Sequence, residues 1–506
     1  MNLDRYRTEA EELFAKELWL ASIQSELEDI GGRPFLKFRV TRNAPIYLDA
    51  LQRVQIGLSE DNPFKGRIAT ELMRGTHAFP ESVESSVLEG LIGRTSRAIS
   101  EGDSSIHAIG FVPFHNREEN KVIQPATQLI LGRRGVGKST LIGKAVEVLR
   151  KRKNLCVVLD LQAYAHRADS RIVSDIFTDV LDQLGKELKL HPQAGVVQKE
   201  VRKLLTLIRG EKIKEPQAVL EVKRLLKEAT NVLATDFFLF LDDFHLISAK
   251  IQPKVLSALH GAVKGARGWL KIAGLTTLVR YYDQATRTGL QVPGDAQIIS
   301  LDLTLTDPHA AETHLRSILA NYLRQVGVGN VSSVISESPF RRLVWANAGV
   351  VRDFLQMFSI ALVSARRARR RKVALSDVNL SIGELGKQKI SDLEQDSRNE
   401  ADTLKQFLTE LETFCLDDKK INAFLVKEET SDFSKTIKTL SDLRVIHLIH
   451  QSITPHKAGE RYEAYMLDYS LFVGFRRKRN IKEIHPEHGL QFQVKELRTL
   501  PVFAAT

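Results

Sequence analysis

A strand–loop–helix pattern near residue 130 constrains this chain more than any other feature of its sequence. The apolar segment Gln128–Leu131 leads into Gly-x-x-x-x-Gly-Lys-Ser, from Gly132 to Ser139, and an apolar helix opens at Thr140. The glycines allow tight turns in which consecutive backbone N–H groups point at a phosphate. Lys138 adds positive charge for the outer phosphates, the Ser139 hydroxyl can bind Mg²⁺, and the helix N-terminus favours an anion. The pattern therefore predicts a nucleoside triphosphate site.

Every residue of this loop is a candidate ligand of the nucleotide, which we expect to be ATP with Mg²⁺. A glycine-rich surface turn is the competing interpretation, but the strand before the loop and the helix after it favour phosphate binding. Lys138 is also a candidate catalytic residue. The candidate nucleotide-binding residues of the loop are Gly132, Arg133, Arg134, Gly135, Val136, Gly137, Lys138, Ser139 and Thr140.

Apolar strands alternate with helices from residue 126 onward, which is the pattern of a parallel sheet covered on both faces. The strands are expected at 128–131, 155–161, 237–241, 269–277 and 296–303. Residues 308–372 then have the periodicity of helices alone. We therefore predict an α/β fold: a phosphate-loop nucleotide-binding sheet followed by a helical lid.

The strand at 237–241 is unbroken in its apolar character and ends in two acids, Asp242 and Asp243. A continuously apolar strand is typical of the centre of a parallel sheet, whose carboxyl edge is where such folds bind their ligand. We assign Asp242, together with Ser139, to Mg²⁺ and Asp243 to polarising the attacking water. The alternative is a pair of surface acids. Because aspartate is shorter than glutamate and reaches water poorly, nucleotide binding is better supported than fast hydrolysis.

Two further features narrow the class of nucleotide-binding protein. The strand at 269–277 ends in Thr276 and Thr277, which are either a polar sensor of the γ-phosphate or caps of the next turn. Arg352 lies in the first turn of an apolar helix, where a cation is unfavourable for the helix dipole and needs a partner. A bound triphosphate provides one, so Arg352 is a further candidate nucleotide ligand.

In this order, the phosphate loop, the Asp242-Asp243 strand, the polar-ended strand and the Gly349-x-x-Arg352 helix resemble an AAA+ ATPase of the origin-recognition or archaeal-initiator type. The resemblance covers roughly residues 126–385. It implies that Arg352 is the lid arginine called sensor 2, and that an arginine finger, with Arg280 or Arg287 as candidates, reaches a neighbouring subunit. An aspartate at Asp243 departs from the usual glutamate and is shared with slowly hydrolysing, signal-transducing relatives.

Initiator-type relatives end in a winged helix, so residues 391–480 are expected to form one. We predict a helix over 393–415, a second element from Ile421, a helix over 432–444 and a hairpin of strands at 445–453 and 462–472. With the second element taken as a helix, this is the helix, helix, helix, hairpin order of a winged helix. The predicted units are 1–125, an N-terminal region of unknown role for which partner binding is a candidate; 126–305, the ATPase core; 306–390, the helical lid; 391–480, the winged helix; and 481–506, a tail.

The net charge of +11 is concentrated in one region. Residues 341–390 hold eleven lysines and arginines against three acids, a net charge of +8. We interpret 366–372 and 432–479, which includes Arg476–Arg479, as DNA-contacting surfaces, although a solvated helix end explains the first equally simply. The two cysteines lie far apart, and neither a signal peptide nor a membrane-length apolar run is evident, so we expect a reducing compartment, the cytoplasm, and no membrane.

Two functions remain open at this stage. The first is an oligomeric AAA+ ATPase that couples ATP binding and hydrolysis to action on DNA, as an initiator or as part of a mobile element or defence system. The second is a nucleotide-gated switch or scaffold in a multi-protein complex, such as one of antiviral defence, with slow hydrolysis and no direct DNA contact.

Overall fold

A parallel five-stranded sheet forms the centre of the computed structural model, which describes residues 3–73, 78–95, 111–114, 116–397, 401–429, 431–455, 460–473, 480–486 and 491–504. Its strands stand in the order β10-β4-β7-β6-β5. They are β4 (Gln128–Leu131), β5 (Leu155–Asp160), β6 (Phe237–Asp242), β7 (Gly268–Gly274) and β10 (Gln297–Ser300). The predicted α/β class is confirmed. The strand expected over 269–277 ends at Gly274, so both threonines lie in the turn after it.

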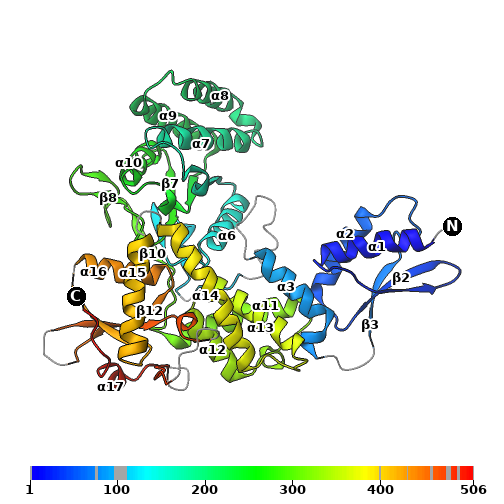
Figure 1. Ribbon diagram of the computed structural model, residues 1–506. Coiled ribbons are helices and arrows are strands. Elements are labelled where there is room, and N and C mark those ends of the chain that lie inside the picture. Colours follow the sequence, from blue (N-terminus) through cyan, green and yellow to red (C-terminus); the bar gives the residue numbers. More distant parts are fainter. Residues whose placement is uncertain are drawn as a thin grey trace.

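Helices cover both faces of this sheet, as the alternation of side chains along its strands requires. Phe240 of β6 packs with the apolar side of α6 (Lys138–Lys151), whereas its neighbour Leu239 belongs to the core under the opposite helices. Those helices are α7 (Ile172–Leu188), α8 (Gly195–Arg209), α9 (Glu215–Leu233) and α10 (Gln252–Val263). Helices α7 to α9 stack at the end of the molecule away from both termini (Figure 1).

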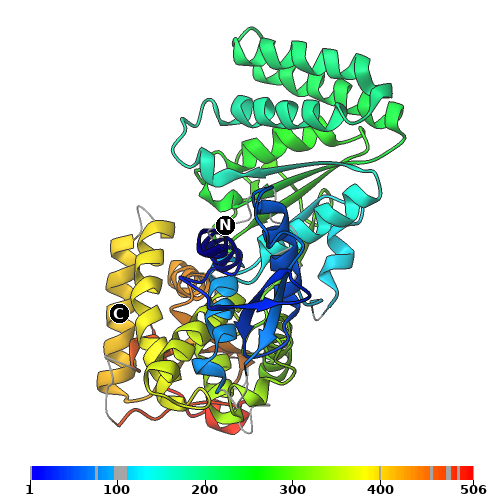
Figure 2. The same ribbon diagram turned by 90° about the vertical axis from the view of Figure 1, so that its right-hand side faces the viewer.

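The lid that follows the sheet consists of four helices. They are α11 (Pro308–Gln325), α12 (Glu337–Asn347), α13 (Val351–Arg367) and α14 (Leu375–Ser397). An N-terminal region packs on this lid through α3 (Val83–Thr95), which contacts α11 and α13. It also contains α1 (Leu3–Glu17), α2 (Pro45–Gly57) and the three-stranded sheet of β1 (Ser25–Asp29), β2 (Pro34–Val40) and β3 (Ile68–Leu72). Figure 2 shows this region beside the lid helices.

The C-terminal part is built from helix α15 (Ala401–Glu412), strand β11 (Ala423–Lys427), helix α16 (Asp432–Asp442) and the hairpin of β12 (Ile446–Ile453) and β13 (Tyr462–Leu467). The three strands form an antiparallel sheet in the order β11-β13-β12. The element predicted to start at Ile421 is therefore a strand rather than a helix. It is an edge strand that pairs with β13, and its apolar residues Ala423 to Val426 are fully buried. A short helix, α17 (Val494–Leu497), lies near the C-terminus.

One apolar core runs through the N-terminal region, the lid and the C-terminal part. It includes Phe38 of β2, Phe354 of α13 and Leu440 of α16. The sheet has its own two clusters on its two faces. The lid and C-terminal part therefore form one packed body beside the sheet. The loop between β4 and α6 lies at the carboxyl edge of the strands, where Arg352 of the lid contacts it.

Candidate nucleotide-binding site

The predicted loop connects β4 to α6 and has the backbone that its glycines require. Gly135 and Gly137 have φ values of +82° and +103°, a region that residues with a side chain rarely adopt. A Cβ at Gly135 would also lie 2.9 Å from Cβ of Arg352, so this position needs glycine for space as well as for conformation. Lys138 is the first residue of α6, which places the loop at the N-terminus of that helix.

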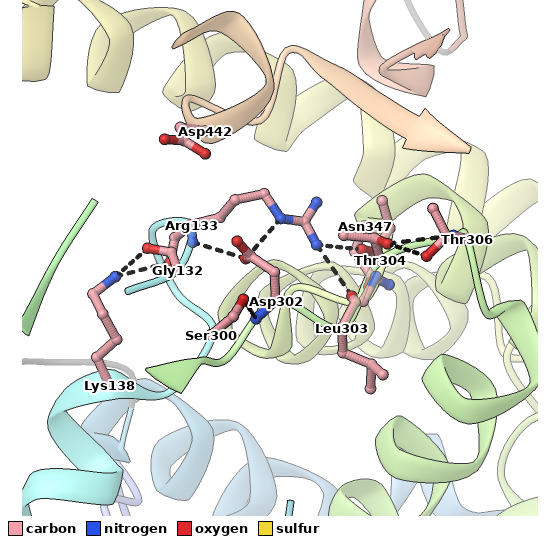
Figure 3. Close-up of polar contacts among 12 residues, drawn as sticks. Gly132, Arg133, Lys138, Ser300, Asp302, Leu303, Thr304, Thr306, Asn347 and Asp442 are labelled. Carbon is pink, nitrogen blue, oxygen red and sulfur yellow. Dashed lines mark hydrogen bonds and ion pairs between the residues drawn. The ribbon is translucent and has the colours of Figure 1, made fainter. Parts of the chain in front are cut away.

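Lys138 lies buried under the loop, where it is surrounded by acceptors. Its Nζ donates to the backbone carbonyl oxygens of Gly132, at 2.7 Å, and of Arg133, at 2.9 Å (Figure 3). Burial lowers the pKa of Lys138, and the negative charge of nearby carboxylates, first Asp243 and then Asp302, opposes this shift. The ammonium group is thus held at the turn that a triphosphate would follow.

The two predicted magnesium ligands, Ser139 and Asp242, meet at the ends of adjacent elements. The Ser139 side chain lies close enough to the Asp242 carboxylate to lower its pKa. Burial and the charge of Asp243 raise the pKa of Asp242 to about 6. A hydroxyl and a carboxylate close to each other are oxygen donors of the kind that Mg²⁺ prefers. Their positions fit a cation next to the phosphate groups, and Mg²⁺ would supply charge neutralisation there.

Asp243, the candidate for polarising water, has a left-handed backbone with a φ of +52°. Its N–H donates to Asp242 Oδ1 at 2.9 Å, which turns the backbone at the end of β6. The Asp243 side chain is 40% exposed, so it faces the open side of the edge rather than the core. A strained conformation in a non-glycine residue beside a phosphate loop is typical of functional positions.

Arg133 connects the loop to the lid through its guanidinium. Its Nε lies 3.2 Å from Asp302 Oδ1, and its Nη2 donates to the carbonyl oxygens of Leu303 (3.1 Å) and Ala348 (2.8 Å). The backbone N–H of Arg133 also donates to Asp302 Oδ1, at 2.9 Å (Figure 3). The side chain is therefore engaged at the junction between β10 and the lid. Sequence reasoning placed Arg133 among the nucleotide ligands and missed this connecting role.

Arg352, the predicted lid arginine, lies directly against the loop. Its backbone N–H donates to the carbonyl oxygen of Gly135 at 3.1 Å, which ties the first turn of α13 to the phosphate loop. Burial lowers the pKa of Arg352, and the positive charges of Arg134 and Arg444 lower it further. The lid and the loop are thus in direct contact. A ligand that shifts the loop would therefore change its hydrogen bond to the first turn of α13.

Thr277, one of the two threonines considered as a sensor, contacts the C-terminal part. Its backbone N–H and its hydroxyl both donate to Asp442 Oδ2, at 2.8 and 2.7 Å. Asp442 is the last residue of α16, and burial raises the pKa of its carboxyl. Figure 3 shows Asp442 on the same side of the loop as the Arg133 guanidinium. The edge of the sheet that carries the phosphate loop is thus in direct contact with a helix of the C-terminal part.

A cavity of about 40 Å³ on the other side of the loop was not predicted. Its walls include the rings of Phe114 and His314, whose centroids lie 5.8 Å apart, and the side chains of Val136 and Val351. Two consecutive acids, Glu118 and Glu119, precede the loop in the sequence. Glu119 Oε2 accepts from the Phe114 N–H at 3.1 Å and so holds the turn that presents this ring. The lining also includes the polar residues Asn116, Glu118, Ser300 and Asp302, so the cavity offers a nucleobase both apolar contact and hydrogen-bond partners.

A small hairpin beyond β7 is formed by β8 (Tyr282–Asp283) and β9 (Thr288–Gly289); of the arginine-finger candidates, Arg287 lies in its turn and Arg280 just before β8. Arg280 is half-exposed and pairs with Asp283 at 3.2 Å. Arg287 occupies the exposed turn, with a φ of +52°. Figure 1 shows this hairpin, labelled at β8, projecting from the sheet, and the structure does not distinguish between the two candidates.

The basic segment 366–372 divides into contacts within the chain and exposed cations. Arg366 donates to the Pro80 carbonyl and the Ser85 hydroxyl, both at 2.7 Å, and pairs with Glu89. Arg370 pairs with Asp377, and Lys372 donates to the Ser332 carbonyl oxygen at 2.8 Å. The exposed cations are Arg367, Arg369 and Arg371.

The interpretation of the whole of 366–372 as a DNA surface is therefore too broad, because Arg366 binds the N-terminal region to the lid. In the second predicted surface, Lys435 pairs with Asp432 at 2.8 Å, and Lys438 lies 3.9 Å from Glu463. The cluster Arg476–Arg479 lies outside the described residues.

Among the helices that the structure describes, none is both long and apolar enough to cross a membrane.

Comparison with known proteins adds a likeness in fold. No family model and no curated protein matches the chain. Similar solved structures include the ORC1 protein of Aeropyrum pernix in complex with DNA, with 14% identity over 71% of this chain and 90% of that chain and a TM-score of 0.38. Drosophila ORC bound to DNA has 12% identity over 83% and 96%, also with a TM-score of 0.38. Domain III of the Thermotoga maritima replication initiation protein DnaA has 11% identity over 57% and 94%, with a TM-score of 0.30.

Initiator-type proteins, the group that the motifs resemble, are thus among the structural matches. At these TM-scores the likenesses do not transfer a ligand or an activity, so the function is inferred from the residues of the site itself.

Proposed function

We propose that this chain is an AAA+-type ATPase that binds ATP with Mg²⁺ and acts on DNA. The observation that carries the nucleotide site is the buried Lys138, held at the N-terminus of α6 by the loop carbonyls of Gly132 and Arg133, with Ser139 and Asp242 close to each other beside it. In this proposal, the backbone N–H groups of the loop and the Lys138 ammonium hold the phosphates, and Ser139 and Asp242 hold the metal. The nucleobase lies against Phe114 and Val136 in the adjoining cavity.

Hydrolysis is assigned to Asp243. Its half-exposed carboxylate stands beside the proposed metal ligand Asp242, where a water can approach the terminal phosphate. Aspartate reaches less far than glutamate, so we propose slow turnover. The lid arginine, Arg352, reports the state of the nucleotide through its backbone contact with Gly135.

The DNA-binding part of the proposal rests on exposed cations of the lid, Arg367, Arg369 and Arg371, together with helix α16. Self-association would bring Arg280 or Arg287 to a neighbouring nucleotide. A protein partner is proposed for the N-terminal region, whose helix α2 exposes 66% of Leu48 and 82% of Ile56. Exposed apolar side chains that lie on one helix suit a protein contact.

The proposal is tested by ATP turnover with and without duplex DNA, at two salt concentrations. DNA is expected to raise turnover of the wild type, and DNA binding is expected to weaken steeply with salt because phosphate contacts release counterions. Asp243→Ala is expected to lower turnover by about 10²- to 10⁴-fold while ATP still binds. The proposal is contradicted if DNA does not change the rate of ATP turnover and if DNA binding does not depend on salt concentration.

The contact between Thr277 and Asp442 favours a second function, a nucleotide-gated switch in a multi-protein complex. It links the edge of the nucleotide site to the C-terminal part without any DNA. A switch of this kind retains its nucleotide tightly, turns over slowly and is indifferent to DNA. The same turnover experiment distinguishes the two functions.

A further inference from the structure

The edge strand β11 is covered on its outer side by a short segment from the last residues of the sequence. The Leu425 N–H donates to the Pro501 carbonyl oxygen at 2.8 Å, and the Phe503 N–H donates to the Leu425 carbonyl oxygen at 2.9 Å. Between them, Val502 forms a parallel bridge with Leu425. Adding an extended segment to an open sheet edge through main-chain hydrogen bonds is one of the common ways in which proteins bind peptides.

The side chain of Phe503 lies among four other phenylalanine rings, each from a different element. Their centroids lie 5.1 to 6.0 Å from that of Phe503, which is the range of favourable ring contacts. Main-chain pairing beside a pocket for one side chain is the arrangement of a peptide-binding groove. The four rings are Phe407 of α15, Phe414 of the π-helix Thr413–Asp418, Phe424 of β11 and Phe433 of α16.

This groove lies at the surface of the C-terminal part. Phe424 is fully buried at its base, but Phe407, Phe414 and Phe433 are only half-buried, even with Phe503 in place. Phe503 is itself half-buried. Partly exposed apolar side chains that gather at one place on a surface are typical of an interaction site.

The segment in the groove is attached over a short length. Leu497 and Leu500, which precede it, are buried in the main core, with exposures of 0% and 3%. Within the described part of the chain, residues 501–504 take part in two hydrogen bonds only, both with Leu425. These residues can therefore leave the groove while the core stays folded, which is a local opening of the kind that a competing ligand needs.

We propose that the edge of β11 and the four phenylalanine rings form a peptide-binding groove for a partner protein, and that Pro501–Phe503 fills this groove in the free chain. The ligand is an extended segment with an aromatic side chain, because the groove offers the N–H and the carbonyl of Leu425 together with a pocket of rings. The chain's own segment is an intramolecular competitor, which lowers the apparent affinity for a partner. This groove is independent of the nucleotide site.

The test uses a fluorescently labelled peptide with the sequence of residues 498–506, whose binding to the full chain is followed by fluorescence anisotropy. Phe503→Ala removes the ring of the chain's own segment, so the groove is free more often. The peptide should bind this variant at least about tenfold more tightly than it binds the wild type. Val502→Ala is the matched control, because its side chain is 37% exposed and alternates to the other side of the segment. It should stay within about threefold of the wild type.

A second peptide, with alanine in place of the phenylalanine, should bind at least about tenfold more weakly, since the pocket of rings selects the aromatic side chain. A chain that ends at Leu500 serves in place of Phe503→Ala if that variant folds poorly. Equal affinity of the wild type and Phe503→Ala for the first peptide, no binding to either, or equal affinity for the two peptides would overturn the groove. Sedimentation of the full chain tests the other occupant: self-association that is lost in Phe503→Ala would make the ligand a second copy and overturn the assignment to a partner protein.

Discussion

Two buried lysines lie at opposite ends of the same parallel sheet, and they differ in the charges around them. Lys138 follows the carboxyl end of β4, whereas Lys271 of β7 pairs in register with Gln128, the first residue of β4. Each donates to backbone carbonyl oxygens: Lys138 to two loop residues, and Lys271 to Gln124 and Ala126 at 2.7 and 2.8 Å. Both are almost fully buried, with exposures of 7% and 0%.

The two lysines differ in the number of carboxylates around them. Asp242, Asp243, Asp302 and Asp442 all act on Lys138, whereas only burial shifts the pKa of Lys271, to about 7. The third acceptor of Lys271 is the neutral side-chain oxygen of Gln128, at 2.6 Å. Lys271, which is held by neutral acceptors, has a structural role at the amino end of β4. Lys138, which has four carboxylates around it, lies in surroundings that suit a ligand with both phosphate groups and a metal ion. The comparison teaches that burial alone does not identify the functional lysine.

The largest expected difference between the two lysines is in nucleotide binding. Lys138→Ala should weaken MgATP by about 100-fold, because charge-assisted hydrogen bonds to phosphate are lost. Lys271→Met, which keeps the length of the side chain, should leave the affinity for MgATP within about threefold. Calorimetric titration measures both. Undiminished binding in Lys138→Ala would remove the basis of the proposed nucleotide site.

The second difference is in the pH dependence of stability. The pKa of Lys271 is lowered to about 7 in the folded chain, below the value of about 10.4 in the unfolded one. Between these values the unfolded chain binds a proton that the folded chain has released, so stability rises with pH. From pH 7 to pH 9 the wild type should gain about 2–3 kcal/mol relative to Lys271→Met. Urea unfolding at both pH values measures this gain, and parallel profiles would show that the three acceptors keep Lys271 charged.

A smaller effect is expected at the metal ligand beside Lys138. The pKa of Asp242 is raised to about 6, and Mg²⁺ needs its deprotonated form. The affinity for MgATP should therefore fall as pH decreases below 6, by about tenfold at pH 5. Because the phosphates of ATP also titrate, the matched control is Asp242→Asn, in which only the nucleotide contributes. Identical pH profiles for the wild type and this variant would exclude Asp242 from the metal site.

The sequence predicted the parts of this molecule that local patterns determine. Strand β4 and the loop after it lie where glycine spacing and apolar periodicity placed them, and β6 ends in Asp242 as expected. Those features depend on residues close together in the chain. The parallel direction of the strands was predicted from the alternation of strands and helices.

Contacts between distant residues were not predictable from such patterns. The sequence suggested Arg133 as a nucleotide ligand and Arg366 as part of a DNA-contacting surface, yet one binds the lid junction and the other the N-terminal region. Their partners lie about 170 to 290 positions away, and half of them are backbone carbonyls, which carry no signature in side-chain chemistry. Strand β11 was also missed, because four apolar residues in a row fit a helix or a buried strand equally.

The smallest expected effect concerns Asp442, which joins the carboxyl edge of the sheet to the C-terminal part. Asp442→Ala removes the acceptor of two hydrogen bonds from Thr277, while Asp442→Asn keeps an oxygen there and is the matched control. A double-mutant cycle with Thr277→Val should give a coupling energy of about 1 kcal/mol in urea unfolding without nucleotide. If this edge responds to nucleotide, as the carboxylates around Lys138 indicate, saturating MgATP should change that coupling.

The matching cycle at the other end of the sheet, Lys271→Met with Gln128→Leu, should give the same coupling with and without MgATP. Equal insensitivity at both ends would show that the two lysine sites differ in charge alone and that the C-terminal part does not sense the nucleotide through Asp442.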